Sequence, residues 1–203
     1  MKEIKFHFIS WRELHDLCFA LFKKIKEQNL RFDRIVCISR GGLVVSRIFS
    51  DFLELPISNF TIVSYVSVGE IGKPRVMEAL AADIKDEKIL LIDEIVDHGA
   101  TLKKAVNYLE KKEPQKIITL APVIKPWAKL KPDYWQMETD KWIIFPYEIK
   151  ETINDIVRIW KKKGMKKEEM KKRFVKIGLR KEQVEFFLKK DKIRNNSVLD
   201  KIS

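Results

Sequence analysis

Residues 89–102 read ILLIDEIVDHGATL, and this stretch decides the fold. Its apolar start suits a strand that is buried on both faces of a parallel sheet. Two carboxylates, Asp93 and Glu94, follow at the carboxyl edge, where open α/β sheets hold their ligands. Residues 97–101 then turn the chain into a helix expected over residues 102–111. Because a glycine turn at a helix N-terminus offers backbone N–H groups to a phosphate, the stretch predicts a sugar-phosphate site.

The rest of the first 150 residues alternates short apolar strands with amphipathic helices. The expected elements are a helix opened by the capping box Ser10 and Glu13, strands at residues 34–38, 60–66 and about 116–123, and a helix at residues 43–52. Such alternation indicates βαβ units. The predicted fold class is α/β, with a mostly parallel sheet flanked by helices and a helical extension at the C-terminus.

Two segments break this alternation. Residues 67–76 contain Gly69, Gly72 and Pro74 and have the composition of a mobile loop. Residues 124–148 contain three prolines and six aromatic residues with little periodicity. This composition favours an irregular hood or lid over a regular helix.

Residues 151–203 form a basic tail. They hold 17 Lys and Arg against 8 Asp and Glu, so the tail carries nine of the chain's twelve net positive charges. Helical spacing predicts three short helices packed as a bundle around Ile153, Ile156, Val157, Trp160, Phe174, Phe187 and Leu188. We therefore expect a core domain over residues 1–150 and a helical extension over residues 151–203, beside the hood as part of the site wall.

Composition excludes several classes of protein. With 203 residues the chain can bury a sizeable core without disulfides or metals, and its two cysteines, Cys18 and Cys37, lie in apolar runs that predict buried, inert thiols. The sequence contains no run of 18 apolar residues and no signal-peptide pattern at its start. We expect a cytoplasmic protein that does not engage a membrane.

The stretch 89–102 resembles the phosphoribosyl-pyrophosphate (PRPP) signature of type I phosphoribosyltransferases. That signature has an apolar strand, two acidic residues, two apolar residues, then Asp, any residue, Gly, a small residue and Thr. Glu94 stands where many members have Asp, and His98 fills a slot often held by Thr or Ser. The resemblance implies that Asp93 and Glu94 bind the ribose hydroxyls. It also implies a 5′-phosphate site made by Asp97, His98, Gly99, Ala100 and Thr101, with the direction of the His98 side chain left open.

Two further segments resemble parts of the same family. Ser39-Arg40-Gly41-Gly42 resembles the pyrophosphate loop in the Ser-Arg-Gly-Gly form of bacterial guanine/xanthine enzymes, which often has a cis peptide before the Arg. The resemblance implies that Ser39, Arg40 and Gly41 bind pyrophosphate, which suits backbone N–H groups and a bidentate guanidinium. Ser64-Tyr65 resembles the Ser-Tyr of the flexible loop that closes over PRPP.

The base-binding parts resemble the purine branch of this family. Lys125 follows the last core strand, as does the family's Lys that points at purine position 6. Trp142 is the implied stacking residue, and the backbone of Ile143 is implied to read the edge of the base. Asp97 is the candidate for proton transfer at N7 while N9 attacks the ribose.

The layout of a 6-oxopurine type of core with a basic helical tail resembles an archaeal adenine phosphoribosyltransferase group. We therefore expect transfer of the phosphoribosyl group from PRPP to N9 of adenine, giving AMP and pyrophosphate. Because Lys125 suits a carbonyl acceptor, a 6-oxopurine (hypoxanthine, guanine or xanthine) stays an alternative. A regulator that responds to PRPP and binds nucleic acid through the tail is a second alternative. Alternating charges in the tail favour a solvated bundle, so nucleic acid is not the expected partner.

The cofactor and assembly follow the same resemblance. Mg²⁺ is expected to arrive with PRPP, and Asp93 and Glu94 contact it directly or through the ribose hydroxyls. The expected partners are PRPP, a purine base and a second copy of the chain in a homodimer.

Overall fold

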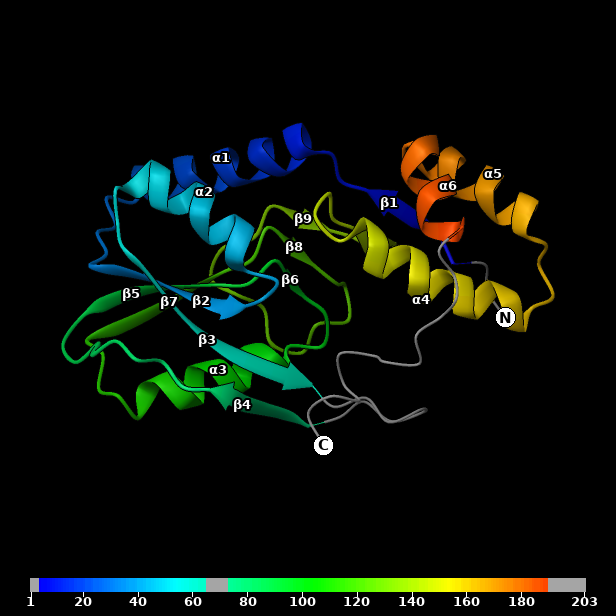
Figure 1. Ribbon diagram of the computed structural model, residues 1–203. Coiled ribbons are helices and arrows are strands. Elements are labelled where there is room, and N and C mark those ends of the chain that lie inside the picture. Colours follow the sequence, from blue (N-terminus) through cyan, green and yellow to red (C-terminus); the bar gives the residue numbers. More distant parts are fainter. Residues whose placement is uncertain (1–3, 65–72, 190–203) are drawn as a thin grey trace. The chain divides into compact units, whose positions relative to one another are not determined.

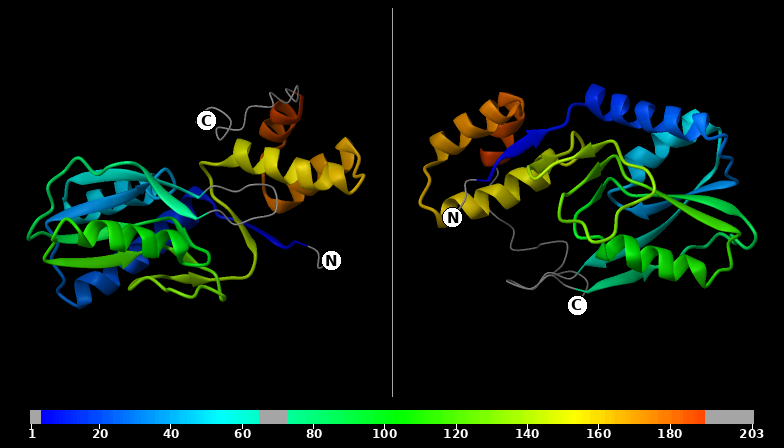
Figure 2. Two further views of the ribbon diagram at one scale, coloured as in Figure 1. Left: turned by 90° about the horizontal axis from the view of Figure 1, so that it is seen from below. Right: turned by 180° about the vertical axis from the view of Figure 1, so that it is seen from behind.

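The computed structural model describes residues 4–64 and 73–189. Within them the chain forms two compact units. One unit comprises residues 12–140, and the other joins the residues before 12 to those after 140. Figures 1 and 2 show the elements of both.

The first unit is built on a five-stranded sheet. Its strand order is β4-β3-β2-β5-β7, and every neighbouring pair is parallel except β3 with β4. This confirms the predicted α/β class with a mostly parallel sheet. The strands are β2 (Arg34–Ser39), β3 (Ile57–Ser64), β4 (Pro74–Glu78), β5 (Lys88–Ile92) and β7 (Lys116–Leu120).

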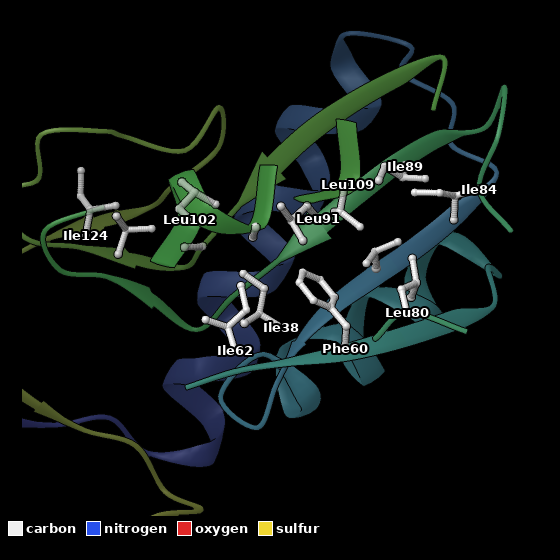
Figure 3. Packing of buried hydrophobic residues seen from close by; sticks show 14 residues of the cluster. Ile38, Phe60, Ile62, Leu80, Ile84, Ile89, Leu91, Leu102, Leu109 and Ile124 are labelled. Carbon is white, nitrogen blue, oxygen red and sulfur yellow. The ribbon is translucent and has the colours of Figure 1, made fainter. Parts of the chain in front are cut away.

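Helices cover both faces of this sheet. These are α1 (Trp11–Glu27), α2 (Leu43–Leu53) and α3 (Ala100–Glu110). α1 and α2 lie on one face and α3 on the other (Figures 1 and 2). Because side chains alternate along a strand, Val36 and Ile38 of β2 join the cluster beneath α3, in which Phe60, Leu91 and Leu102 are also buried (Figure 3).

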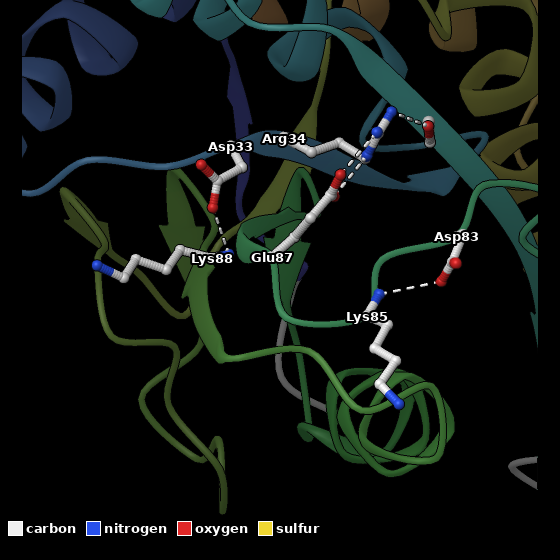
Figure 4. Close-up of polar contacts among 7 residues, drawn as sticks. Asp33, Arg34, Asp83, Lys85, Glu87 and Lys88 are labelled. Atoms are coloured by element: carbon white, nitrogen blue, oxygen red, sulfur yellow. Dashed lines mark hydrogen bonds and ion pairs between the residues drawn. The ribbon is translucent and has the colours of Figure 1, made fainter.

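A charged pair fixes the start of the central strands. The guanidinium of Arg34 donates to both carboxylate oxygens of Glu87, with Nε–Oε2 at 2.7 Å and Nη2–Oε1 at 2.8 Å (Figure 4). Beside it, the backbone N–H of Lys88 donates to Oδ2 of Asp33 at 2.7 Å. Bidentate pairing is the stronger kind of charged hydrogen bond, so it holds β2 and β5 in register at the edge opposite their carboxyl ends.

A small second sheet lies beyond β5. It consists of β6 (Ile95–Val96), β8 (Val123–Ile124) and β9 (Met137–Glu138), all parallel. Ile95 pairs with Val123 and Val96 pairs with Ile124. The residues that follow, Asp97 and Lys125, therefore leave the sheet side by side.

The structure adds short strands to two segments that were predicted to be irregular. Residues 74–76 belong to β4, an edge strand that pairs antiparallel with β3, whereas residues 65–72 of the predicted loop lie outside the described residues. The predicted hood contains β9 and β10 (Trp142–Ile144). Strands as short as these leave little periodicity in the sequence, and they are defined by the strands with which they pair.

The second unit combines two strands with three helices. β1 (Phe6–Phe8) pairs parallel with β10, and α4 (Ile149–Lys162), α5 (Lys167–Ile177) and α6 (Lys181–Lys189) follow. A buried cluster includes Ile153, Ile156, Val157, Trp160, Phe174 and Leu188, with Phe187 packed against it. The predicted three-helix bundle is thus confirmed.

The boundary of this unit differs from the expected one between residues 150 and 151. β1 and β10 bring Ile144 and the partly buried Phe6 and Phe8 into the helical cluster. The assignment of residues 1–150 and 151–203 to separate functions stays a prediction.

Two expectations from composition can be compared with the structure. Cys18 and Cys37 are buried, and burial raises the pKa of each thiol to about 12, as expected of inert cysteines. Within residues 4–64 and 73–189, no helix has the length and apolarity needed to cross a bilayer.

The helical cluster predicts unequal effects of two neighbouring substitutions. Phe174 is fully buried and its ring centroid lies 4.7 Å from that of Trp160, whereas Val175 is 42% exposed. Phe174→Ala should lower the free energy of unfolding by about 3–5 kcal/mol, because it leaves a cavity. Val175→Ala should change it by about 0.5 kcal/mol or less. Urea unfolding followed by tryptophan fluorescence measures both, and equal losses would contradict the packing.

Candidate active site

A cleft of about 360 Å³ opens at the carboxyl edge of β2 and β5. Because these strands pair in parallel, with Cys37 opposite Ile92, the turns that follow them meet at the same edge. The cleft brings together residues that the sequence predicts as binding groups: Ser39, Arg40, Gly41, Asp93, Glu94, Asp97, His98, Gly99, Ala100 and Thr101.

The turn after β2 is closed by its own backbone. The peptide bond between Ser39 and Arg40 is cis, as the resemblance implies. The N–H of Gly42 donates to the carbonyl of Ile38 at 3.0 Å, and the N–H of Leu43 donates to that of Arg40 at 3.1 Å. α2 starts at this turn without a side-chain cap hydrogen bond, and the backbone N–H groups of a helix N-terminus are suited to anions.

Both glycines of this turn lie against the acidic segment after β5. A Cβ added at Gly41 would lie 1.7 Å from Oε2 of Glu94. A Cβ added at Gly42 would lie 2.5 Å from the carbonyl oxygen of Ile92. The first collision involves the end of a flexible side chain, whereas the second involves backbone of the central strand.

The two acidic residues after β5, Asp93 and Glu94, differ in burial. Asp93 is only 8% exposed, and Glu94 is half-buried. Burial raises the pKa of Asp93, while hydrogen bonds with Glu94 act in the opposite direction. One of these bonds runs from the N–H of Glu94 to Oδ1 of Asp93 at 3.0 Å. A ligand that donates hydrogen bonds or brings a cation would favour the charged carboxylates.

The turn before α3 has the geometry of a phosphate cradle. Gly99 adopts φ of +86° and occupies the N-cap position, and it has no side-chain cap hydrogen bond. A Cβ there would meet Leu130 at 2.8–2.9 Å, so both its conformation and its space require glycine. The first amides of α3 and the dipole of the helix therefore face an anion-binding turn.

Asp97 follows β6 and lies in a cluster with side chains from the turn that follows β8. The indole Nε1–H of Trp127 donates to Oδ1 of Asp97 at 2.6 Å, and Nδ1 of His98 lies 3.2 Å from the same oxygen. Lys125 is 6% exposed, and its Nζ lies 5.6 Å from the ring centroid of Trp127. Burial lowers the pKa of Lys125, and the charges of Asp97 and Asp140 oppose this shift.

The remaining predicted site residues belong to other segments of the chain. Ser64 ends β3, and Tyr65 lies outside the described residues. Trp142 and Ile143 belong to β10 in the second unit, where they pair with Phe6 and His7 of β1. Trp142 is 42% exposed, which suits a stacking ring, and Ile143 is buried. Their role in base binding stays a prediction.

The comparisons with known proteins agree with this geometry. The sequence profile of the phosphoribosyl transferase domain matches residues 10–152. The chain belongs to the phosphoribosyl transferase domain family. It is therefore an enzyme of the glycosyltransferase class, and residues 153–203 lie beyond the part that the profile covers.

Named relatives of this phosphoribosyltransferase come from yeast, bacteria and archaea. Xanthine phosphoribosyltransferase 1 of Saccharomyces cerevisiae is 30% identical over 58% of this chain and 68% of its own. Xanthine-guanine phosphoribosyltransferase of Gluconobacter oxydans is 27% identical over 69% and 83%. The crystal structure of a purine phosphoribosyltransferase from Pyrococcus horikoshii superposes with a TM-score of 0.63 at 29% identity, covering 70% of this chain and 93% of the other.

The donor set fits Mg²⁺ that arrives with a substrate. Asp93 and Glu94 offer carboxylate oxygens in the cleft. Among residues 4–64 and 73–189, no group of three or more His, Cys, Asp or Glu residues could form a metal cage. Mg²⁺ usually keeps several waters and binds through one or two carboxylates together with substrate phosphates. The two carboxylates therefore fit Mg²⁺ that is bound together with substrate phosphates.

Sequence reasoning missed the contact between Trp127 and Asp97. The contact depends on the pairing of β6 with β8, and strands of two residues are too short to leave a pattern in the sequence. The available signal was the dipeptide Pro126-Trp127 directly after Lys125, which places an aromatic ring in a turn beside a predicted site residue.

Substitution of the two glycines should have different effects, one on PRPP binding and the other on thermal stability. Gly41→Ala should displace only the carboxylate of Glu94, because that is what the new Cβ meets, and should weaken PRPP binding about tenfold or more with an almost unchanged Tm. Gly42→Ala collides with backbone and should lower the Tm by several degrees. Isothermal titration calorimetry with PRPP and Mg²⁺, with thermal unfolding of both variants, checks this. Wild-type affinity in Gly41→Ala would show that the two turns do not act together.

Proposed function

We propose that the chain transfers the 5-phosphoribosyl group of PRPP to N9 of a 6-oxopurine (xanthine, guanine or hypoxanthine) and releases pyrophosphate. The observation that carries this choice is Lys125, a buried ammonium that leaves the small sheet beside Asp97. An ammonium donates hydrogen bonds and accepts none, so it suits the carbonyl oxygen at purine position 6 and not the amino group of adenine.

The relatives support the same choice. Those from Saccharomyces cerevisiae and Gluconobacter oxydans carry xanthine or xanthine and guanine in their names. The adenine expectation rested on the layout of the basic tail, which lies beyond the matched domain. We therefore place the 6-oxopurines first and adenine second.

PRPP would bind across the two turns of the cleft. The amides and hydroxyl of residues 97–101 hold the 5′-phosphate, and Asp93 and Glu94 accept hydrogen bonds from the 2′- and 3′-hydroxyls. Arg40 and the backbone of the turn at residues 39–41 bind the diphosphate. When bound with PRPP, Mg²⁺ supplies positive charge that stabilises the leaving diphosphate.

The chemical step exchanges one bond for another. N9 of the base attacks C1′ of the ribose while the bond from C1′ to the pyrophosphate oxygen breaks, and pyrophosphate leaves from the opposite face. Asp97 holds or accepts the proton at N7 as the base gains its new bond. Lys125 donates to the oxygen at position 6, and Trp142 and the backbone of Ile143 are the proposed stacking and edge contacts.

The helices of the tail give less support to the alternative function, a regulator that binds nucleic acid. Many cations of the bundle face acids: Lys171 lies 3.3 Å from Glu185, and Arg173 lies 3.1 Å from Glu169. α6 also places Glu182 on its exposed surface. Such pairing suits a solvated surface better than a helix that approaches phosphates.

The direct test of this function is a panel of bases. The protein is incubated with PRPP, Mg²⁺ and one of xanthine, guanine, hypoxanthine or adenine, and the nucleotide and pyrophosphate are quantified. We expect the largest kcat/KM with a 6-oxopurine. A preference for adenine would instead support the adenine phosphoribosyltransferase expected from the core and its basic tail. No product with any base would refute the proposal.

Two substitutions separate binding from chemistry. Thr101→Val removes a hydroxyl donor and should raise the KM for PRPP about tenfold with little change in kcat. Asp97→Asn keeps the shape but loses the base, so it should lower kcat about a hundredfold with little change in the KM for PRPP. Steady-state kinetics combined with single-turnover experiments excludes a limit set by product release. Unchanged single-turnover rates in Asp97→Asn would remove the proton-transfer role.

A further inference from the structure

Trp127 sits in a turn that the backbone ties to both sides of Asp97. The N–H of Lys125 donates to the carbonyl of Val96 at 2.9 Å, and the N–H of Lys129 donates to that of His98 at 3.3 Å. The turn is thus attached to the residues directly before and after Asp97. Although the indole is 46% exposed, its place opposite Asp97 is set by these backbone bonds.

The local sequence explains the shape of this turn. The N–H of Ala128 donates to the carbonyl of Lys125 at 3.0 Å, which closes a β-turn with Pro126 and Trp127 at its centre. Proline fixes φ at the first central position. The segment therefore presents the ring of Trp127 in a defined direction while Lys125 remains buried.

One oxygen of Asp97 receives the contacts of this cluster. Oδ1 accepts the indole N–H at 2.6 Å and lies 3.2 Å from Nδ1 of His98. Two neighbours on one oxygen restrict rotation of the carboxylate, so Oδ2 keeps a defined direction. An indole nitrogen donates but cannot accept a proton, and Trp127 therefore orients the carboxylate without competing for the proton that it handles.

We propose that Trp127 is a positioning residue, which holds Asp97 by Oδ1 so that Oδ2 meets the proton at N7 of the purine. This role rests on the proposed function. Lys125 supports it, because its ammonium lies 5.6 Å from the centroid of the same ring, and a cation at this distance favours that position of the indole.

The test is a double-mutant cycle. Trp127→Phe keeps an aromatic ring but removes the N–H donor, and it should lower the single-turnover rate about tenfold while the KM for PRPP changes less than about twofold. In an Asp97→Asn background the same change should have almost no further effect, because the group that it positions is already lost. Trp135→Phe is the matched control, since Trp135 also lies near a lysine, with Nζ of Lys131 at 5.4 Å, but is partly buried and packs against the core cluster.

Each outcome decides the role. A wild-type rate in Trp127→Phe, or an equal loss with and without Asp97, would refute it. A gain in kcat/KM for the base would also refute it, since the indole would then block the place of the base. If the wild-type protein forms no nucleotide from any of the four bases, the proposed function falls and the role falls with it. An active wild-type enzyme that tolerates Trp127→Phe refutes the role alone.

A second measurement tests the contact without turnover. In protein labelled with ¹⁵N at the indole nitrogens, the signal lost in Trp127→Phe identifies Trp127. That signal should shift in Asp97→Asn, because the acceptor changes from a carboxylate to an amide. The indole signal of Trp135 should stay in place. An unmoved Trp127 signal would contradict the hydrogen bond on which the role depends.

Discussion

The parallel pairing of β2 with β5 is the constraint on which the rest of the site depends. It places the turn at residues 39–42 and the acidic segment at residues 93–94 at one edge of the sheet. Gly41 and Gly42 then allow an approach so close that any Cβ would collide with Glu94 or with the carbonyl of Ile92. The bidentate pair of Arg34 and Glu87 holds the same two strands at their other end. Register and close approach together form one cleft, in which we propose that PRPP binds.

The pairing of β6 with β8 brings the residues that we propose for the base next to Asp97, which lines this cleft. It sets Lys125 and Trp127 beside Asp97, although these residues are distant in the sequence. Burial shifts the pKa of Asp93 upward and that of Lys125 downward, so both groups are less stable in their charged forms than they would be in water. A substrate that carries cations, hydroxyls and a carbonyl compensates both.

Local signals made much of this arrangement predictable. The buried strand, the acidic pair and the glycine turn lie within residues 89–102, so the phosphate cradle at Gly99 could be inferred from adjacent residues. The helical bundle of the tail was predictable from apolar spacing. In contrast, β10 pairs with β1 near the other end of the chain, and β4 is a short strand defined by its pairing with β3. The contact of Trp127 with Asp97 follows from a two-residue pairing. Those features depend on tertiary structure, which sequence periodicity does not record.

A crystal structure of the protein with PRPP and Mg²⁺ tests the central claim most directly, because that claim concerns where two phosphate groups bind. The account predicts the 5′-phosphate on the amides of residues 97–101, the ribose hydroxyls at Asp93 and Glu94, and the diphosphate at Arg40 and Gly41. A PRPP molecule that leaves either turn unoccupied, or that binds with its two ends exchanged, would contradict it.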